Sequence, residues 1–427
     1  MQKTDVRYAT YVQILKEELV PAMGCTEPIA LAYAAAKARE VLGCVPEKVV
    51  LEVSGNIIKN VKSVVVPNTN GMKGLAAAAA AGIIGGKAEK KLEVIAEVSD
   101  EQKAEMAAFL ETADISVEVA NNGVVFDIIV KLYKGEESAI VRIAVFHTNI
   151  IYIEKNGEVV LDLGQPTDGN ENNMADKSLL SIEGIIDFAD TCDVEDVKET
   201  IGRQIAYNTA IAEEGLKNSW GANVGSTLLK YCGTDVHTRA KAMAAAGSDA
   251  RMSGCELPVV INSGSGNQGM TVSLPVITYA REMQVSEEEM YRALVVANLC
   301  SIHQKTGIGR LSAYCGAVSA GAASACGIAY LHGEKAEGVS AVLQNAVVVT
   351  SGLICDGAKP SCAGKIAAAV EAGLVGYYMY KNGQNYEGGD GICGEDIERT
   401  VKNVGILAAQ GMRQTDAVIL DIMVGRL

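Results

Sequence analysis

The sequence predicts an α+β protein, with a mostly helical C-terminal domain and an inserted α+β domain that carries a largely antiparallel sheet. Short β-branched runs are concentrated between residues 46 and 165, whereas apolar residues recur at helical spacing from residue 175 to the end. Aromatic residues make up only 5% of the chain, while Ala and Gly are abundant, which favours closely packed helices. We therefore divide the chain into residues 1–45, 46–165 and 175–427, and expect the N-terminal helices of 1–45 to pack on the helical domain.

The N-terminal segment predicts two helices separated by a break. Residues 5–20 have an amphipathic pattern, and the Val20-Pro21 pair interrupts it. A second helix begins in GCTEP, where Thr26 can act as its cap and Pro28 is tolerated in the first turn.

The residue pattern of the middle segment predicts a sheet with two helices. Its strand candidates are the β-branched runs 48–56, 61–67, 91–98, 115–120, 124–133, 138–147 and 149–161. The stretches 74–86 and 100–113 resemble helices, and the polar, turn-rich segment 163–173 is the best linker candidate.

The C-terminal half contains one run that superficially resembles a membrane span. Residues 311–331 carry no charge, but they are rich in Gly, Ala and Ser and include Tyr314 and two cysteines. A helix that is apolar on all sides is normally buried in a core, so we expect a core helix here.

Charge and cysteine usage narrow the classes of function. The net charge of −15 argues against nucleic acid and anionic membranes as partners. The N-terminus has no apolar signal core, and the eleven cysteines are not spaced as in small secreted domains. We expect a cytoplasmic protein with free thiols, and a homodimer, as is common among soluble enzymes.

Three cysteines in almost uncharged sequence, Cys315, Cys355 and Cys362, are the strongest candidates for metal chemistry. Cys355 and Cys362 flank a six-residue turn sequence between apolar stretches, where two thiolates can converge. Three thiolates can hold an iron–sulfur cluster with one iron left open, and that iron is a Lewis acid. The alternatives are three ordinary buried cysteines or a zinc site.

Cys25 precedes a helix, where backbone N–H groups and the helix dipole lower the pKa of a thiol. A thiolate there can act as a base, a nucleophile or a metal ligand. The alternative is a half-buried residue of the capping region. The neighbouring Thr26 is a candidate substrate contact.

A glycine-rich loop follows the apolar run LPVVIN and formally matches G-x-G-x-x-G. We reject a dinucleotide site, because Pro275 is expected to interrupt the following helix. Closely spaced amides and two hydroxyls form an anion nest that suits a substrate carboxylate, unless the loop is a plain turn. The candidate residues are Ser263, Gly264, Ser265, Gly266 and Asn267.

Three further polar residues are substrate-binding candidates. Lys305 can pair with a carboxylate or lie on the surface, and Asn70 can close a pocket or belong to a solvated turn. Asn298 is either a satisfied core amide or a ligand contact. His147, His237 and His332 show no ligand spacing.

Five motifs together resemble the L-cysteine desulfidases, which are similar in turn to the alpha part of bacterial iron–sulfur L-serine dehydratases. They are PAMGCTEPIALAYA, SGSGNQG, the Cys315 region, GLICDGAKPSCAGKIA and the ending GGDGICGEDIERTVKNVG…GMRQTD…ILDIM. The resemblance implies a 4Fe–4S cluster on Cys315, Cys355 and Cys362, and Cys25 as the base. Serine dehydratases have a motif closer to Ser-His-Thr at Cys25-Thr26 and a wider spacing of the last two ligands.

The expected function is therefore β-elimination from L-cysteine to sulfide, ammonia and pyruvate without pyridoxal phosphate, in a helical iron–sulfur catalytic domain at 175–427. Alternatives are an iron–sulfur L-serine or L-threonine dehydratase and a cysteine- or redox-sensing metal-binding protein without turnover. The central expectation is geometric: the sulfur atoms of Cys315, Cys355 and Cys362 meet, and Cys25 faces them across a cavity.

Overall fold

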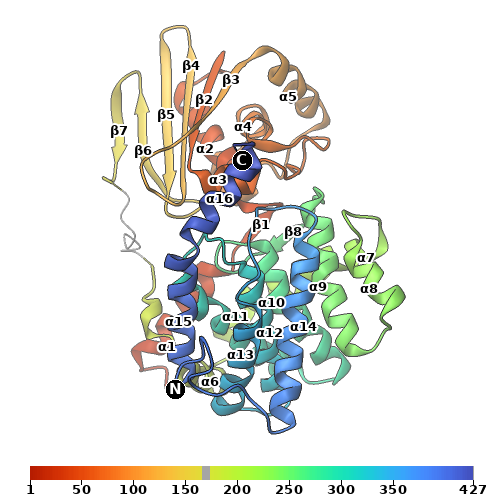
Figure 1. Ribbon diagram of the computed structural model, residues 1–427. Helices are drawn as coiled ribbons and strands as arrows, with labels where there is room; N and C mark the ends of the chain where they lie inside the picture. The colour runs from red at the N-terminus through yellow and green to blue at the C-terminus, as the bar shows by residue number, and fades with distance from the viewer. Residues whose placement is uncertain (166–173, 427) are drawn as a thin grey trace.

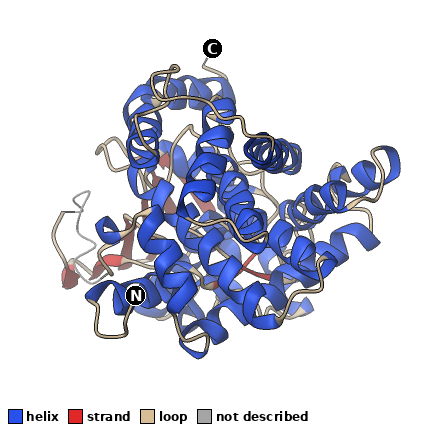
Figure 2. Cartoon of the chain, turned by 90° about the horizontal axis from the view of Figure 1, so that it is seen from below, coloured by secondary structure: helices blue, strands red, loops and turns tan. Residues whose placement is uncertain are grey.

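The computed structural model describes residues 1–165 and 174–426, and it confirms the α+β class. A sheet domain lies on top of a larger helical domain, as Figure 1 shows. Seen from below in Figure 2, the near side of the molecule consists of helices, with the strands behind them. Most of the linker candidate 163–173 lies outside the described residues.

The sheet has six strands in the order β3-β2-β4-β5-β6-β7. Only β2 and β3 pair in parallel, so the prediction of a largely antiparallel sheet is confirmed. The strand bounds are β2 Lys48–Val53, β3 Asp114–Val119, β4 Asp127–Lys134, β5 Glu137–Ala144, β6 Ile150–Lys155 and β7 Glu158–Asp162.

Four α-helices in the described residues, α2 (Thr26–Leu42), α3 (Gly55–Val61), α4 (Gly74–Gly85) and α5 (Asp100–Thr112), belong to the sheet domain, and the sequence had placed α2 on the helical domain. α2 packs against β4, β5 and α4, and α5 packs on α4. Only α1 (Val6–Glu18) lies on the helical domain as expected for 1–45. The alanine faces of α2 and α4 explain the difference: a Cβ at Gly82 would lie 2.1 Å from the Ala32 carbonyl oxygen, so the backbones touch.

Two predicted strands are wrong. Residues 61–67 end α3 (Gly55–Val61) and then form a loop, and residues 91–98 contain the end of a 3-10 helix, η1 (Ala88–Glu93), and turns. Their apolar side chains, including Val64, Val66 and Ile95, are buried without belonging to a ladder. Hydrophobic runs of this length do not distinguish a strand from a buried loop.

The helical domain packs around α12 (Gly316–Leu331). This helix contacts α10 (Gly266–Glu282), α11 (Glu287–Ile308), α13 (Ala336–Thr350) and α14 (Cys362–Lys381). Residues 317–329 of α12 are all buried, so the predicted core helix at 311–331 is confirmed. Close approach again depends on glycine, because a Cβ at Gly321 would lie 2.6 Å from the backbone of Ala369 in α14. No helix in residues 1–165 or 174–426 is long and apolar enough to cross a membrane.

The other elements of the helical domain follow the chain order. They are η2 Lys177–Leu179, α6 Ile182–Thr191, α7 Glu195–Lys217, α8 Val224–Tyr231, α9 Val236–Met252, β8 Pro258–Val260, α10 Gly266–Glu282, α11 Glu287–Ile308, α13 Ala336–Thr350, α14 Cys362–Lys381, α15 Ile397–Ile406, η3 Leu407–Gly411 and α16 Arg413–Val424. Pro275 lies inside α10 and does not end it, which corrects the reason given for rejecting a dinucleotide loop.

Two of the contacts between the domains lie at α16 and at a small second sheet. The C-terminal helix α16 lies beside α3 (Figure 1), where the buried Lys59 pairs with Asp416. A short two-stranded sheet of β1 (Pro21–Met23) and β8 also links the chain before α2 to the chain before α10. Both contacts lie close to the predicted site residues.

Candidate active site

The pairing of β1 with β8 brings Cys25 next to the glycine-rich loop. Cys25 occupies the N-cap position of α2 directly after β1, and the loop 263–265 follows β8. Ser263 and Gly264 have φ values of 49° and 82°, so the loop turns through two left-handed residues before α10. The Thr26 hydroxyl donates to the Gly264 carbonyl oxygen at 2.8 Å and fixes the two segments together.

A backbone bridge brings Cys315 and Cys355 together. Tyr314 and Ile354 form an isolated antiparallel bridge, and the Cys355 amide donates to the Ala313 carbonyl oxygen at 2.6 Å. Cys315 is the N-cap residue of α12, whereas Cys362 is the first residue of α14. The turn between Cys355 and Cys362 lies against the sheet domain, because a Cβ at Gly357 would lie 2.2 Å from the Lys59 carbonyl oxygen.

All four cysteines line one cavity of about 100 Å³. The candidates Ser263, Gly264, Ser265, Asn267 and Lys305 line it as well. In the described part of the chain, however, no three His, Cys, Asp or Glu side chains are grouped tightly enough for a single metal ion. The sulfur atoms therefore share a cavity with Cys25, but they do not meet at one point.

Cys25 donates a hydrogen bond to Glu27, with Sγ 3.3 Å from Oε2. Burial and the Glu27 carboxylate raise the pKa of Cys25 well above its usual value, and the positive charge of Arg251 does not compensate. The prediction of a lowered pKa at this helix start is therefore wrong. The helix N-terminus is outweighed by desolvation and by a neighbouring negative charge.

Glu27 is held by groups from two segments. The Asn60 amide donates to Oε1 at 3.2 Å, and His147 Nε2 lies 3.9 Å from the same oxygen. Burial opposes the charged form, but His147, the helix-start amide and the Cys25 thiol together lower the pKa of Glu27 to about 2. Glu27 is therefore a buried carboxylate at neutral pH, placed beside a neutral thiol.

Burial also shifts the pKa values of Cys315, Cys362 and Lys305 in this cavity. Burial and the neighbouring Cys355 raise the pKa of Cys315 to about 12, and burial also raises the pKa of Cys362. Burial lowers the pKa of Lys305 to about 8, against the opposing influence of Cys355 and Cys315. The thiols of Cys315 and Cys362 are therefore protonated at neutral pH in the cluster-free chain.

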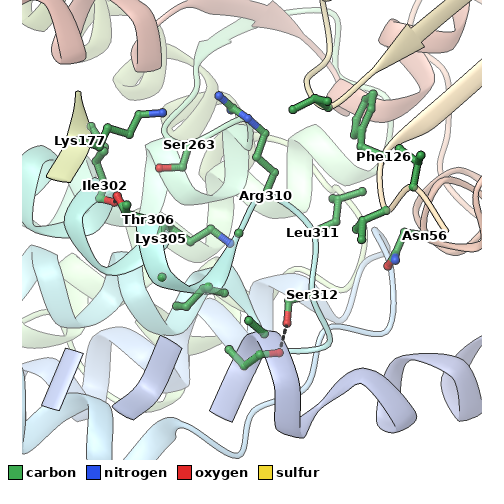
Figure 3. Close-up of a pocket in the computed structure, with 18 of the residues that line it drawn as sticks. Asn56, Phe126, Lys177, Ser263, Ile302, Lys305, Thr306, Arg310, Leu311 and Ser312 are labelled. Atoms are coloured by element: carbon green, nitrogen blue, oxygen red, sulfur yellow. Dashed lines mark hydrogen bonds between the residues drawn. The ribbon is translucent and has the colours of Figure 1, made fainter. Parts of the chain in front are cut away.

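A second, larger cavity of about 900 Å³ lies between the two domains and shares Ser263, Lys305 and Arg310 with the cysteine cavity. In Figure 3 these three side chains lie together on one side, and Asn56 and Phe126 of the sheet domain lie on the other. Arg310 donates to the buried Glu18 at 3.2 Å and lies over the Phe146 ring. The larger cavity, called the entrance chamber below, therefore adjoins the cysteine cavity.

Comparison with known proteins decides the family. The sequence model of the serine dehydratase alpha chain matches residues 88–421. The chain belongs to the serine dehydratase alpha chain family. It is also similar to UPF0597 proteins: 59% identical to one from Desulfitobacterium hafniense, over 100% of this chain and 99% of the relative. A UPF0597 protein from Lachnoclostridium phytofermentans is 51% identical over 97% of this chain and 99% of the relative. One from Treponema denticola is 46% identical over 98% of each chain.

The three cysteine thiols of this chain, at positions 315, 355 and 362, fit an iron–sulfur cluster better than a single metal ion. In a cubane cluster each cysteine binds a different iron, so the thiolates surround a volume and do not converge on one atom. Cys315, Cys355 and Cys362 come from three segments that face one cavity. Cys315 and Cys362 also stand at helix N-termini, which favour a negative sulfur.

Four predicted substrate contacts do not line the cysteine cavity. Asn298 is fully buried, and its amide is satisfied by Gln204, Leu294 and Asn262, so it is a core residue that supports the loop. Asn70 is exposed in a turn at φ 56°. Thr26 is the first residue of α2, not its cap, and holds Gly264; Gly266 packs on Arg251.

The sequence analysis missed Glu27, Asn60, His147 and Arg251, which all line the cysteine cavity. Glu27 could have been found from its position two residues after Cys25 at the helix start. His147 was dismissed because its spacing fits no metal motif, yet its imidazole lies over Gly264, where a Cβ would be 2.9 Å from Cε1. Nothing in the local sequence of Asn60 or Arg251 marks them.

Proposed function

We propose that the chain is an iron–sulfur-dependent L-cysteine desulfidase, which eliminates sulfide from L-cysteine and releases pyruvate and ammonia. The observation that carries this proposal is the common cavity of Cys25, Cys315, Cys355 and Cys362, next to the amide-rich loop at the start of α10. Membership of the serine dehydratase alpha chain family supports a lyase of this kind.

The loop at the start of α10 is proposed to hold the substrate carboxylate. The N–H groups of the first helical turn have no partners within the helix, and they carry a partial positive charge. Gly266 and Asn267 are the first two residues of α10, behind the N-cap Ser265. A carboxylate at this position would lie beside Cys25, because Thr26 is bonded to Gly264.

Cys25 is proposed to take the α-proton of the substrate as a thiolate. Its own proton must leave first, and Glu27 Oε2, which accepts the hydrogen bond of the thiol, is the first group on its way out. Because the pKa of Glu27 is about 2, Glu27 passes this proton on and does not keep it. The α-carbon electrons then form the Cα–Cβ double bond of aminoacrylate while the Cβ–S bond breaks and sulfide departs. Aminoacrylate tautomerises and hydrolyses in water to pyruvate and ammonia.

Cys315, Cys355 and Cys362 would hold the 4Fe–4S cluster that the resemblance implies. When bound, such a cluster supplies a Lewis-acidic iron without a protein ligand, which polarises the leaving sulfur. The chain's own contribution at the start of α12 is a wall of small residues, because Gly316 and Ala317 line the cavity next to Cys315.

An L-serine or L-threonine dehydratase is the second candidate, because the family description names serine dehydratase. Cys25-Thr26 in place of a Ser-His-Thr motif favours the desulfidase. A cysteine- or redox-sensing protein without turnover remains the alternative of another class. As part of this proposal we keep the expected cytoplasmic homodimer.

Parallel assays test the proposal. Anaerobically reconstituted protein is supplied with L-cysteine, L-serine or L-threonine, and sulfide, ammonia and the 2-oxo acid are measured. We expect sulfide and pyruvate in equal amounts from L-cysteine at the highest kcat/KM. Faster turnover of L-serine or L-threonine would establish the dehydratase, and binding without product would establish the sensor.

A further inference from the structure

Arg251 is a buried cation at the end of α9, and it faces the cysteine cavity. Its side chain is 2% exposed and lines this cavity but not the larger chamber. Nε donates to the Gly24 carbonyl oxygen at 2.9 Å, and Nη1 donates to Asn267 Oδ1 at 3.1 Å. The guanidinium is therefore fixed between the residue before Cys25 and the first turn of α10.

The third nitrogen of this guanidinium has no partner. Nη2 is buried and makes no hydrogen bond, and no carboxylate in residues 1–165 and 174–426 forms an ion pair with Arg251. The guanidinium of arginine stays protonated in proteins, so the charge cannot be removed by loss of a proton. A buried charge without a counterion is strongly destabilising unless a ligand supplies one.

The glycine-rich loop is shaped around this side chain. A Cβ at Gly266 would lie 2.5 Å from Arg251 Nε, so only glycine lets the guanidinium lie against the loop. Asn267 Oδ1 accepts the hydrogen bond from Nη1 and so orients the guanidinium of Arg251. The backbone N–H of Asn267 belongs to the first turn of α10, where N–H groups have no partner within the helix. Arginine and helix-start amides thus face the same part of the cavity.

Arg251, Lys305 and Arg310 line this cavity, and Arg310 already pairs with the buried Glu18, so Arg251 and Lys305 are the two cations to compare as carboxylate partners. Lys305 is 6% exposed and lines both cavities. Its ammonium group therefore faces the entrance chamber as well as the cysteines. Arg251 lies only at the cysteine cavity and next to Gly24. A guanidinium can also keep its bonds to Gly24 and Asn267 while Nη2 donates to a carboxylate, and a single ammonium group cannot make these three contacts from the same position.

We propose that Arg251 is the residue that binds the α-carboxylate of the amino-acid substrate, and that the enzyme therefore accepts free amino acids and rejects their amides. This inference rests on the proposed function for the identity of the substrate. The Gly24 and Asn267 bonds hold Arg251 so that a carboxylate on Nη2 brings the substrate's α-carbon beside Cys25.

The experiment compares L-cysteine with L-cysteinamide, which has no carboxylate. For wild-type protein we expect kcat/KM for the acid to exceed that for the amide by about 100-fold, the usual effect of removing one partner of a buried charge pair. Arg251→Met is expected to reduce this ratio to below about 5-fold, mainly through the KM of the acid. Iron content should stay at the wild-type level.

Lys305→Met is the matched control, because it removes the other cation of the same cavity. We expect this variant to keep a large acid-to-amide ratio. A ratio that collapses in Lys305→Met but not in Arg251→Met would overturn the inference, and so would loss of iron in Arg251→Met, which would assign Arg251 to the cluster. Equal use of acid and amide by the wild type would overturn it without any variant.

Two further measurements keep the test decisive. If Arg251→Met does not fold, Arg251→Lys is used. We expect its acid-to-amide ratio to fall at least about tenfold, because one ammonium group cannot keep the Gly24 and Asn267 bonds and also reach the carboxylate; an unchanged ratio contradicts the proposal. If no amino acid is turned over, calorimetry gives dissociation constants for L-cysteine, L-serine and L-cysteinamide. Carboxylate-dependent binding that requires Arg251 then upholds this inference while the proposed function fails, and absence of such binding overturns both.

Discussion

The thiol of Cys25 and the carboxylate of Glu27 form a hydrogen-bonded pair at the first turn of α2, with Sγ 3.3 Å from Oε2. Both side chains are buried, and the pKa values of the two groups move apart, upward for Cys25 and downward for Glu27. A neutral acid next to an ionised base is an arrangement typical of proton transfer sites. Glu27 is thus the first acceptor for a proton leaving Cys25.

Replacing Glu27 with Gln should reduce kcat for L-cysteine by roughly 100-fold, because a general base normally contributes a factor of this size or more. The amide keeps the shape of the side chain but cannot accept the proton. Steady-state kinetics of sulfide release measure this effect. Glu40→Gln, on the exposed side of the same helix, is the control. Equal kcat for Glu27→Gln and wild type would exclude a role for this carboxylate.

Cys25, Cys315 and Cys362 should react slowly with iodoacetamide in cluster-free protein at pH 7.5. The thiolate is the reacting form, and the raised pKa values of these thiols keep its fraction small. The exposed Cys44 and Cys232 serve as internal references. Mass spectrometry of timed samples should show alkylation of these two at least about tenfold faster. Early labelling of Cys25 would mean that its thiolate is stabilised after all.

Lys305→Met should make cluster-free protein more stable at neutral pH. The pKa of Lys305 in the folded chain is about 8, against 10.5 ordinarily, so the folded state binds this proton more weakly than the unfolded state. Burial of the charged Lys305 therefore lowers the free energy of unfolding by about 3 kcal/mol at pH 7. This loss of stability is complete below pH 8, becomes smaller between pH 8 and 10.5, and is absent above pH 10.5.

Urea unfolding of both proteins between pH 7 and 10.5 measures this difference. The comparison cancels the titration of the thiols, which both proteins share. The stability advantage of Lys305→Met must decrease as the pH rises. A stability difference between the two proteins that does not change with pH would show that burial does not lower the pKa of Lys305.

Gly264→Ala should disturb the loop beside Cys25. Gly264 has φ 82°, and a Cβ would lie 2.9 Å from Cε1 of His147. Gly43 has φ 89° with open space around its Cα, so Gly43→Ala is a control with the backbone strain alone. Each variant should lose about 1 kcal/mol of stability, but only Gly264→Ala should raise KM for L-cysteine. Similar KM values for the two variants would count against the loop as the carboxylate site.

The fold was predictable where periodicity and length were unambiguous. The buried helix at 311–331, the amphipathic α1 and the strands from 115 to 161 follow from local pattern. The position of α2 did not, because a helix buried on nearly all sides carries no stripe that indicates its partner. Val64 and Ile95 were taken for strand residues because burial alone does not reveal hydrogen bonding.

The candidate site was predictable only in part. The cysteines and the 263–267 loop stand out in the sequence because their neighbours are small and uncharged. Arg251 and His147 come from a long helix and a sheet loop, and only the pairing of β1 with β8 and the domain contact place them at the cavity. The pKa of Cys25 depends on burial and on Glu27, which no helix-end rule anticipates.

The most direct test is the iron and acid-labile sulfide content of anaerobically purified protein, measured together with sulfide release from L-cysteine. We expect about four irons per chain and a brown colour in wild type, and loss of colour, iron and activity in Cys355→Ser. Cys326→Ser is the matched control, since Cys326 is fully buried in α12 and does not line the cavity. A colourless, iron-free protein with full activity would contradict the account.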